Sequence, residues 1–166
     1  MKKITTRDLT LAAVVGAIYV VLGYFGNLFN LTFGAIQCRF AEALTVLPFL
    51  NPVTVWGLFI GCLITNILSP YGLLDMIFGP LMTLIAALLT ARCKNKWLAP
   101  LPPVLCNAVV IGALIAFQTA GFGAAFFPAF CYQALTIGAG QLLACYGLGV
   151  PLLTAVEKLL PKFRRR

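Results

Sequence analysis

The chain has 166 residues, of which 61% are hydrophobic and only 10% are charged, and its mean hydropathy is +1.00. A soluble domain carries roughly 25% charged residues, so this composition excludes a soluble globular protein and indicates a chain embedded in a membrane. The net charge of +8 comes mainly from basic clusters at the start, middle and end of the chain. Such clusters are typical of cytoplasmic loops next to anionic lipid headgroups, so we read them as topology signals and expect no nucleic-acid partner.

Six apolar stretches, separated by turn-forming or basic residues, predict six membrane-spanning helices. They cover about Leu9–Phe25, Cys38–Leu50, Val53–Leu68, Leu73–Ala91, Pro103–Gln118, and Pro128 to either Pro151 or Leu160. The expected connections are Gly26–Gln37, the turn at Asn51 and Pro52, Ser69–Gly72, Arg92–Pro102 and Ala120–Phe127. We therefore expect an all-α integral membrane protein, with a six-transmembrane-helix bundle that forms a single membrane domain over residues 1–166.

The basic residues predict the orientation of this bundle. An even number of spans puts both termini on one side of the membrane, and the positive-inside rule makes that side the cytoplasm. The same arrangement puts the middle basic cluster, Arg92, Lys94 and Lys96, inside. The outer connections 26–37, 69–72 and 119–127 contain no charged residue. We expect a multi-pass protein of a bacterial plasma membrane.

Three charged residues lie inside the otherwise uncharged stretch between Asp8 and Arg92. These are Arg39, Glu42 and Asp75. A charge within a membrane segment costs roughly 2.5–3.5 kcal/mol on insertion scales, so we treat these residues as candidate functional groups. The predicted topology places them in the outer half, together with further candidate ligand-binding residues. Those are Asn66, Gln118, Tyr132, Gln133 and Gln37. This distribution predicts a polar cavity that opens to the outside.

Arg39 and Glu42 are three residues apart, so they are expected to share one helix face. In one interpretation they form an ion pair that neutralises both charges in the membrane. In the other, Glu42 points into the cavity as a ligand acceptor while Arg39 keeps it ionised. A carboxylate accepts two parallel N–H donors well, and the N–H edge of guanine would suit it. Asp75 is neutral, the N-cap of the fourth span, or the counter-ion of a cationic ligand group.

Small residues and aromatic residues indicate contacts rather than chemistry. Ala12, Ala13, Gly16 and Ala17 form small-x-x-x-small pairs, which let another helix approach closely. Gly57 and Gly61 offer the same geometry and are expected to pack within the bundle. Aromatic residues near the outer face predict an interfacial belt, and the alternative is that one or two of them stack on a flat heterocycle.

Several catalytic signatures are missing from the sequence. There is no His in the chain, none of the six Cys is spaced C-x-x-C, and no G-x-x-x-x-G-K-[S/T] loop occurs. A Ser–His or Cys–His nucleophile is therefore impossible. We expect no catalytic residue, no metal site and no cofactor, and we do not expect an enzyme.

One segment combines two of the candidate residues with a recognisable pattern. It runs Arg39-Phe40-Ala41-Glu42-Ala43-Leu44, and it is followed by Gly57 to Cys62, Asn66, Asp75, Phe78-Gly79, Thr83 and Leu101-Pro102-Pro103. Over nearly the whole chain this pattern resembles the QueT family of S components of energy-coupling factor (ECF) transporters, which is assigned to the uptake of queuosine precursors. Family members often carry Gly-Glu where this chain has Gly140-Gln141, and this difference bears on which precursor is bound.

The resemblance implies a ligand, partners and a mechanism. The ligand would be a 7-deazaguanine such as preQ0, preQ1 or queuine, with Glu42 on its guanine-like edge and Asp75 near a cationic substituent. The Ala12, Ala13, Gly16 and Ala17 surface would dock on the ECF T subunit, two ATPase subunits would supply energy, and the loaded S component would topple in the bilayer. Alternatives are an S component for another vitamin-like solute or amino acid, a self-sufficient carrier or channel, and a structural scaffold.

Overall fold

The computed structural model describes residues 5–29, 39–67 and 69–163, and within these ranges the protein is helical, with no strand. The first four elements are α1 (Thr6–Leu28), η1 (Phe40–Phe49), α2 (Thr54–Asn66) and α3 (Gly72–Arg92). The fifth crossing joins α4 (Leu101–Cys106), η2 (Asn107–Ile111) and α5 (Gly112–Ala120). The sixth joins α6 (Phe126–Leu142), η3 (Leu143–Gly149) and α7 (Val150–Leu159), and a short η4 (Pro161–Phe163) follows.

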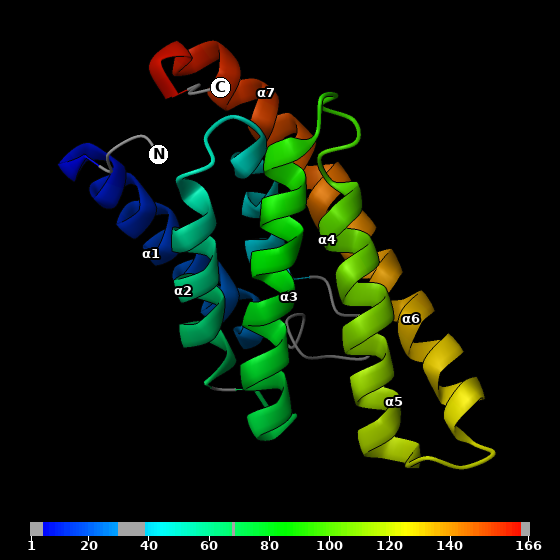
Figure 1. Ribbon diagram of the computed structural model, residues 1–166. Coiled ribbons are helices and arrows are strands. Elements are labelled where there is room, and N and C mark those ends of the chain that lie inside the picture. Colours follow the sequence, from blue (N-terminus) through cyan, green and yellow to red (C-terminus); the bar gives the residue numbers. More distant parts are fainter. Residues whose placement is uncertain (1–4, 30–38, 68, 164–166) are drawn as a thin grey trace.

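Six helical segments correspond to the six predicted spans, and they alternate in direction. The start of α1, the end of α7 and the connection between α3 and α4 lie at one end of the bundle, and the end of α2, the start of α3 and the α5–α6 connection lie at the other (Figure 1). We call the first the basic end, because Arg7, Arg92 and Lys158 lie there, and the second the distal end. Four crossings are long and apolar enough to span a membrane, and η1 and α2 are shorter apolar helices. The sixth crossing continues past Pro151 to Leu159, as one of the two predicted boundaries required.

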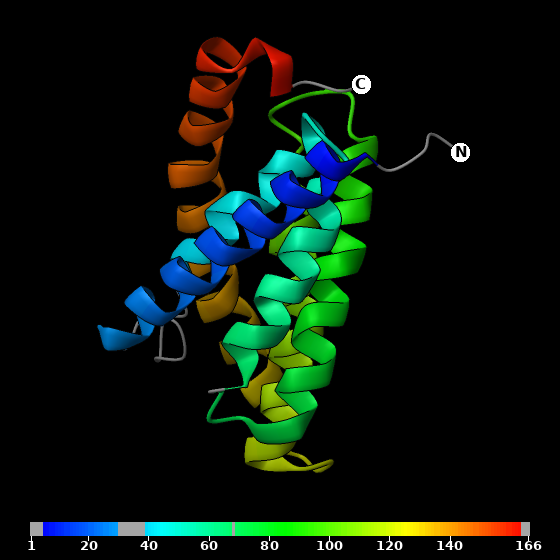
Figure 2. The same ribbon diagram turned by 90° about the vertical axis from the view of Figure 1, so that its left-hand side faces the viewer.

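The second crossing is the central element of the fold, and it is a 3₁₀ helix. A 3₁₀ helix rises about 2 Å per residue, so its ten residues cover about 20 Å, compared with about 15 Å for the same length of α-helix. Every residue from Ala41 to Phe49 is buried, because α1, α2, α3, η3 and α7 all contact η1. Figure 2 shows α1 lying obliquely across α2 and η1.

The three-residue period of η1 gives it three straight faces. One face presents Ala41, Leu44 and Leu47 to a core cluster that includes Tyr19 and Leu58. A second face presents Val46 and Phe49 to another cluster, with Leu153 and Ala99. The third face carries Glu42, Thr45 and Pro48, so the one carboxylate of η1 does not share a face with the η1 residues that form the two apolar clusters.

Helices α1 and α2 pack through small residues. Gly57 and Gly61 pack within the bundle, as predicted, whereas Ala12 and Gly16, which were expected on a partner-docking surface, pack on α2. A Cβ atom added to Gly16 would lie 2.9 Å from the main-chain oxygen of Gly57, and one added to Gly57 would overlap the main-chain oxygen of Ala12. Ala12 and Gly16 are buried in this contact, while Ala13 and Ala17 are exposed on the outer side of α1. The same close approach brings Tyr19 against Gly61 and turns its ring into the core.

Candidate functional site

Five buried polar side chains from four elements gather between the middle of the bundle and the distal end. They are Tyr19 on α1, Arg39 and Glu42 at the start of η1, Asn66 at the end of α2 and Asp75 at the start of α3. Each is at most 5% exposed. Four of the five were predicted as site residues from the sequence, and the structure brings these four together. We refer to the five residues as the polar cluster.

Asn66 joins three helix ends within the polar cluster. Its Oδ1 atom accepts a hydrogen bond of 2.5 Å from Nη2 of Arg39, and its Nδ2 atom donates one of 3.1 Å to the main-chain oxygen of Asp75. Gly79 makes room for this amide, because a Cβ atom at that position would overlap Nδ2 of Asn66. The start of η1, the end of α2 and the start of α3 are therefore held together by one side chain.

Glu42 is fully buried and only one of its carboxylate oxygens has a partner. The Tyr19 hydroxyl donates a hydrogen bond of 2.6 Å to Oε1, whereas Oε2 has no hydrogen-bond partner in the described part of the chain. The direct ion pair with Arg39, which was one of the two interpretations, is not found among the described residues. Arg39 precedes η1 with an extended backbone, so its side chain leaves the face that carries Glu42 and reaches Asn66 instead.

Asp75 fixes the connection that leads into α3. Its Oδ2 atom accepts a hydrogen bond of 2.5 Å from the Ser69 hydroxyl, and the Ser69 oxygen accepts one of 3.2 Å from the main-chain N–H of Tyr71. The capping alternative for Asp75 is not what the structure shows. The N-cap of α3 is Tyr71, without a side-chain cap, and Asp75 is the fourth residue of the helix, in its first turn.

The remaining predicted ligand-binding residues lie outside this network. Gln118 is exposed at the end of α5 and donates a hydrogen bond of 2.8 Å from Nε2 to the main-chain oxygen of Tyr71, which ties α5 to the α2–α3 connection. Tyr132 is exposed and Gln133 is half-buried on α6, and among the described residues no side-chain hydrogen bond links either to the polar cluster. Gln37 lies outside the described residues.

Tyr19 was not predicted as a site residue, although its sequence context contained a signal. A Tyr in the interior of an apolar span must find a partner for its hydroxyl group, and the nearest intramembrane acceptors were Glu42 and Asp75.

The main-chain oxygen of Glu42 has contacts of its own. The Thr45 hydroxyl donates a hydrogen bond of 2.6 Å to this oxygen. The Cys145 thiol lies 3.5 Å from that oxygen and 3.5 Å from Oε1 of Gln141.

Cavities flank the described part of the bundle at both of its ends. One of about 600 Å³ lies at the basic end between α1 and the C-terminal helices, near Arg7, Asn51 and Leu160. A second of about 340 Å³ lies at the distal end between α3 and the fifth crossing, and its lining is apolar and includes Phe78 and Phe117. The polar cavity expected from the sequence stays a prediction.

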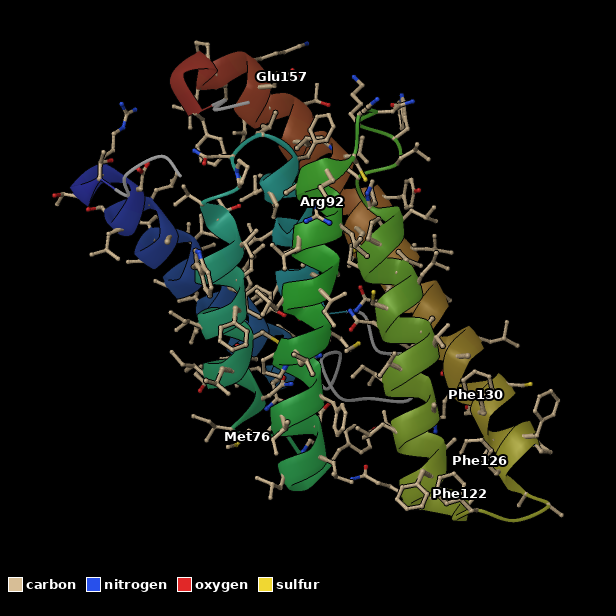
Figure 3. All side chains as sticks on the ribbon, in the orientation of Figure 1. Met76, Arg92, Phe122, Phe126, Phe130 and Glu157 are labelled. Atoms are coloured by element: carbon tan, nitrogen blue, oxygen red, sulfur yellow. The ribbon has the colours of Figure 1, made fainter. Side chains whose placement is uncertain are left out.

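Aromatic rings continue from the distal cavity onto α6. The ring centroids of Phe117, Phe122, Phe126 and Phe130 follow one another at 4.5, 5.5 and 6.3 Å. Figure 3 shows the last three of these side chains at the distal end, away from Arg92 and Glu157 at the basic end. This row suits the predicted aromatic belt, and Phe117, Phe122 and Phe126 also line the apolar cavity.

Comparison with known proteins supplies the family. The profile of the QueT transporter family matches residues 9–158, which include all five residues of the polar cluster. The chain belongs to the QueT transporter family. This membership confirms the family predicted from the sequence and places the chain among multi-pass transport proteins, not among enzymes.

A curated relative agrees with the family assignment. The chain is 39% identical over 85 residues to a protein of Lactococcus lactis subsp. cremoris (strain MG1363) named queuosine precursor transporter QueT. The aligned region covers 51% of this chain and 50% of that relative, so the chain spans about half the length of the relative it matches. No solved structure matches the chain.

Proposed function

We propose that this protein is the substrate-binding S component of an ECF-type importer, and that it captures a queuosine precursor with a 7-deazaguanine ring. The family match and the name of the curated relative support the substrate class. The observation that carries the proposal is the Oε2 atom of Glu42, a carboxylate oxygen that is fully buried and has no partner among the described residues. Such an atom is costly unless something binds it, and a ligand would be that partner.

The chemistry of the polar cluster suits a guanine-like edge. A carboxylate held by Tyr19 at one oxygen still has acceptor capacity for the ring N–H and the exocyclic amine of a 7-deazaguanine. The Arg39–Asn66–Asp75 chain keeps the surrounding helix ends in place, so the carboxylate is held before the ligand arrives. Asp75 is proposed to face a cationic substituent, such as an aminomethyl group.

The charge distribution supports capture from outside the cell. Arg7, Arg92, Lys94, Lys96 and Lys158 all lie at the basic end, which the positive-inside rule assigns to the cytoplasm. The polar cluster lies between the middle of the bundle and the opposite end, where the described connections carry no charge. We therefore propose that the protein lies in the plasma membrane with the distal end outward.

The protein is proposed to work with an energising module, because its sequence contains no nucleotide-binding loop of its own. Partner docking on the T subunit would use the small residues of α1 that stay exposed, Ala13 and Ala17. Ala12 and Gly16 already pack on α2, so they support this surface from behind. Two ATPase subunits would drive toppling of the loaded S component, which would carry the ligand from outside to inside.

Binding of 7-deazaguanines to the purified protein tests the proposal, with Glu42→Gln as the decisive variant. Losing a charge-assisted hydrogen bond costs about 1.5–3 kcal/mol, so we expect the dissociation constant to rise about 10- to 100-fold by titration calorimetry. Glu157→Gln is the matched control. Figure 3 shows Glu157 at the basic end and Met76, the residue after Asp75, toward the distal end, so Glu157 lies far from the polar cluster.

Three outcomes would contradict parts of this proposal. Stabilisation by tryptophan or a vitamin, but by no 7-deazaguanine, would assign the protein to another solute. Uptake by liposomes that contain only this chain would indicate a self-sufficient carrier or channel. Absence of any bound solute by mass spectrometry after purification, together with no effect of Glu42→Gln, would favour a structural scaffold.

A further inference from the structure

A second buried polar atom without a partner lies in the other half of the bundle. Among the described residues, only Oε2 of Glu42 and Nδ2 of Asn107 are buried side-chain polar atoms with no hydrogen-bond partner. The first is an acceptor and the second is a donor. Asn107 is 3% exposed and lies in the fifth crossing, where η2 begins. Buried polar groups are nearly always paired, so this donor needs an explanation of its own.

The packing of the fifth and sixth crossings places Asn107 at the depth of another amide. These crossings are antiparallel, since Gly112 packs on Ala134 and Gly138 on Ala108. Ile111 and Ile137 meet in one core cluster. One helical turn from each, toward the basic end, come Asn107 and Gln141, and both are buried. The two amides therefore lie within about one turn of each other, above an apolar cluster.

This amide layer adjoins the main chain at Glu42. The Cys145 thiol lies 3.5 Å from Oε1 of Gln141 and 3.5 Å from the Glu42 main-chain oxygen, so η1 and the sixth crossing meet here. Both crossings also depart from regular α-helix at this depth, with π-helical η2 starting at Asn107 and π-helical η3 starting two residues after Gln141. Short π-helical segments frequently occur at functional sites.

We propose that Asn107 is a second ligand-contacting residue, which donates its Nδ2–H to the 6-oxo group of a 7-deazaguanine. This inference rests on the proposed function, in which Glu42 accepts from the N–H groups of the same edge. A carboxylate cannot donate to a ring carbonyl, so an edge that carries two donors and one acceptor needs an additional donor. The unpaired amide supplies that donor, and the unpaired carboxylate oxygen supplies the acceptor.

Asn107→Leu tests the proposal, because a ligand contact and a structural role change apo stability and ligand affinity differently. Leu removes the unpaired amide at similar volume, so we expect the apo protein to melt at the same or a higher temperature. We expect the dissociation constant for 7-deazaguanine to rise about tenfold, the effect of losing one hydrogen bond that leaves a buried carbonyl unpaired.

Asn51→Leu is the matched control. Asn51 is also a buried Asn, but its Nδ2 atom donates to the Phe163 main-chain oxygen at 3.0 Å, at the basic end. We expect this variant to melt at a lower temperature and to bind 7-deazaguanine with unchanged affinity. If Asn107→Leu behaves like Asn51→Leu, Asn107 has a structural role and the proposal is overturned.

A ligand analogue provides a second measurement, the preference for the oxo over the thio compound. A purely structural role of Asn107 would not affect that preference. The 6-thio analogue of 7-deazaguanine keeps the ring N–H that Glu42 would accept, but its sulfur is a weaker acceptor than oxygen. We expect the wild type to prefer the oxo compound and the Asn107→Leu variant to bind both almost equally. An unchanged preference in the variant would overturn the inference alone. A wild type that binds no 7-deazaguanine would remove the proposed function, and this inference with it.

Discussion

The basic residues at one end of the bundle and the charged residues toward the other end differ in burial. At the basic end, Arg92, Lys94 and Lys158 are exposed, and they set the orientation with little involvement in packing. Toward the distal end, Arg39, Glu42 and Asp75 are almost completely buried and are held by named partners. The comparison shows that exposed charged residues determine the orientation in the membrane, whereas buried charged residues form the candidate site.

The largest effect in this comparison is expected from Asn66→Leu. This change removes the acceptor of Arg39 and the donor to the Asp75 main chain, so it weakens the support of a buried charge. We expect the free energy of unfolding to fall by about 3 kcal/mol, the lower end of the range for breaking buried charge contacts. Unfolding in a mixed-micelle denaturant titration would measure it.

Lys94→Ala is the control at the basic end for this change. Lys94 is exposed in the α3–α4 connection, and surface substitutions usually stay within about 0.5 kcal/mol. Equal losses in the two variants would mean that the buried cluster is no more important for stability than the exposed charges, and the contrast between the two ends would disappear.

A smaller effect is expected from Tyr19→Phe, which removes the hydrogen bond to Oε1 of Glu42. Both carboxylate oxygens would then lack a partner, and the free energy of unfolding should fall by about 1–3 kcal/mol. Tyr146→Phe is the matched control, because the Tyr146 hydroxyl donates at 3.0 Å to the main-chain oxygen of Trp97 in an exposed contact. Thermal unfolding of the two variants side by side would test this, and a Tyr146→Phe loss as large as that of Tyr19→Phe would count against it.

The smallest effect on stability is expected from two introduced cysteines, which test which end of the bundle faces the outside of the cell. In a variant without the native cysteines, Asn95→Cys would mark the basic end and Gly123→Cys the distal end. A Cβ atom at Gly123 meets no other atom within 4 Å, so the fold should be unaffected. A membrane-impermeant thiol reagent added to intact cells should label position 123 and not position 95. The reverse pattern would invert the proposed orientation.

The sequence was sufficient to predict the crossings, because apolar length, turn residues and basic clusters act locally and all indicate the same six segments. It also predicted that Arg39, Glu42, Asn66 and Asp75 would converge, since alternating spans bring their ends to one side. The sequence did not predict which residues of the polar cluster form hydrogen bonds with each other. The extended backbone of Arg39 redirects that side chain to Asn66, and the buried Tyr19 hydroxyl reaches Glu42 from a helix 23 residues away in the chain.

The amide layer shows a different limit of sequence reasoning. Asn107 and Gln141 are visible in the sequence as polar residues within apolar spans, but their shared depth depends on the register between two antiparallel helices. That register is set by Gly112 against Ala134 and Gly138 against Ala108, contacts that no local pattern encodes. The 3₁₀ form of η1 was likewise not predicted, although Glu42, Thr45 and Pro48 already recur at its three-residue period.

Because of that period, each of the three faces of η1 packs against different neighbours. Replacing a side chain with one of similar size alters one face only, whereas deleting or adding one residue rotates all later residues of η1 by about 120°. A deletion between Glu42 and Thr45 would aim Thr45 and Pro48 at an apolar cluster and bring aliphatic groups next to the carboxylate. The central segment should therefore accept changes of composition far more readily than changes of length.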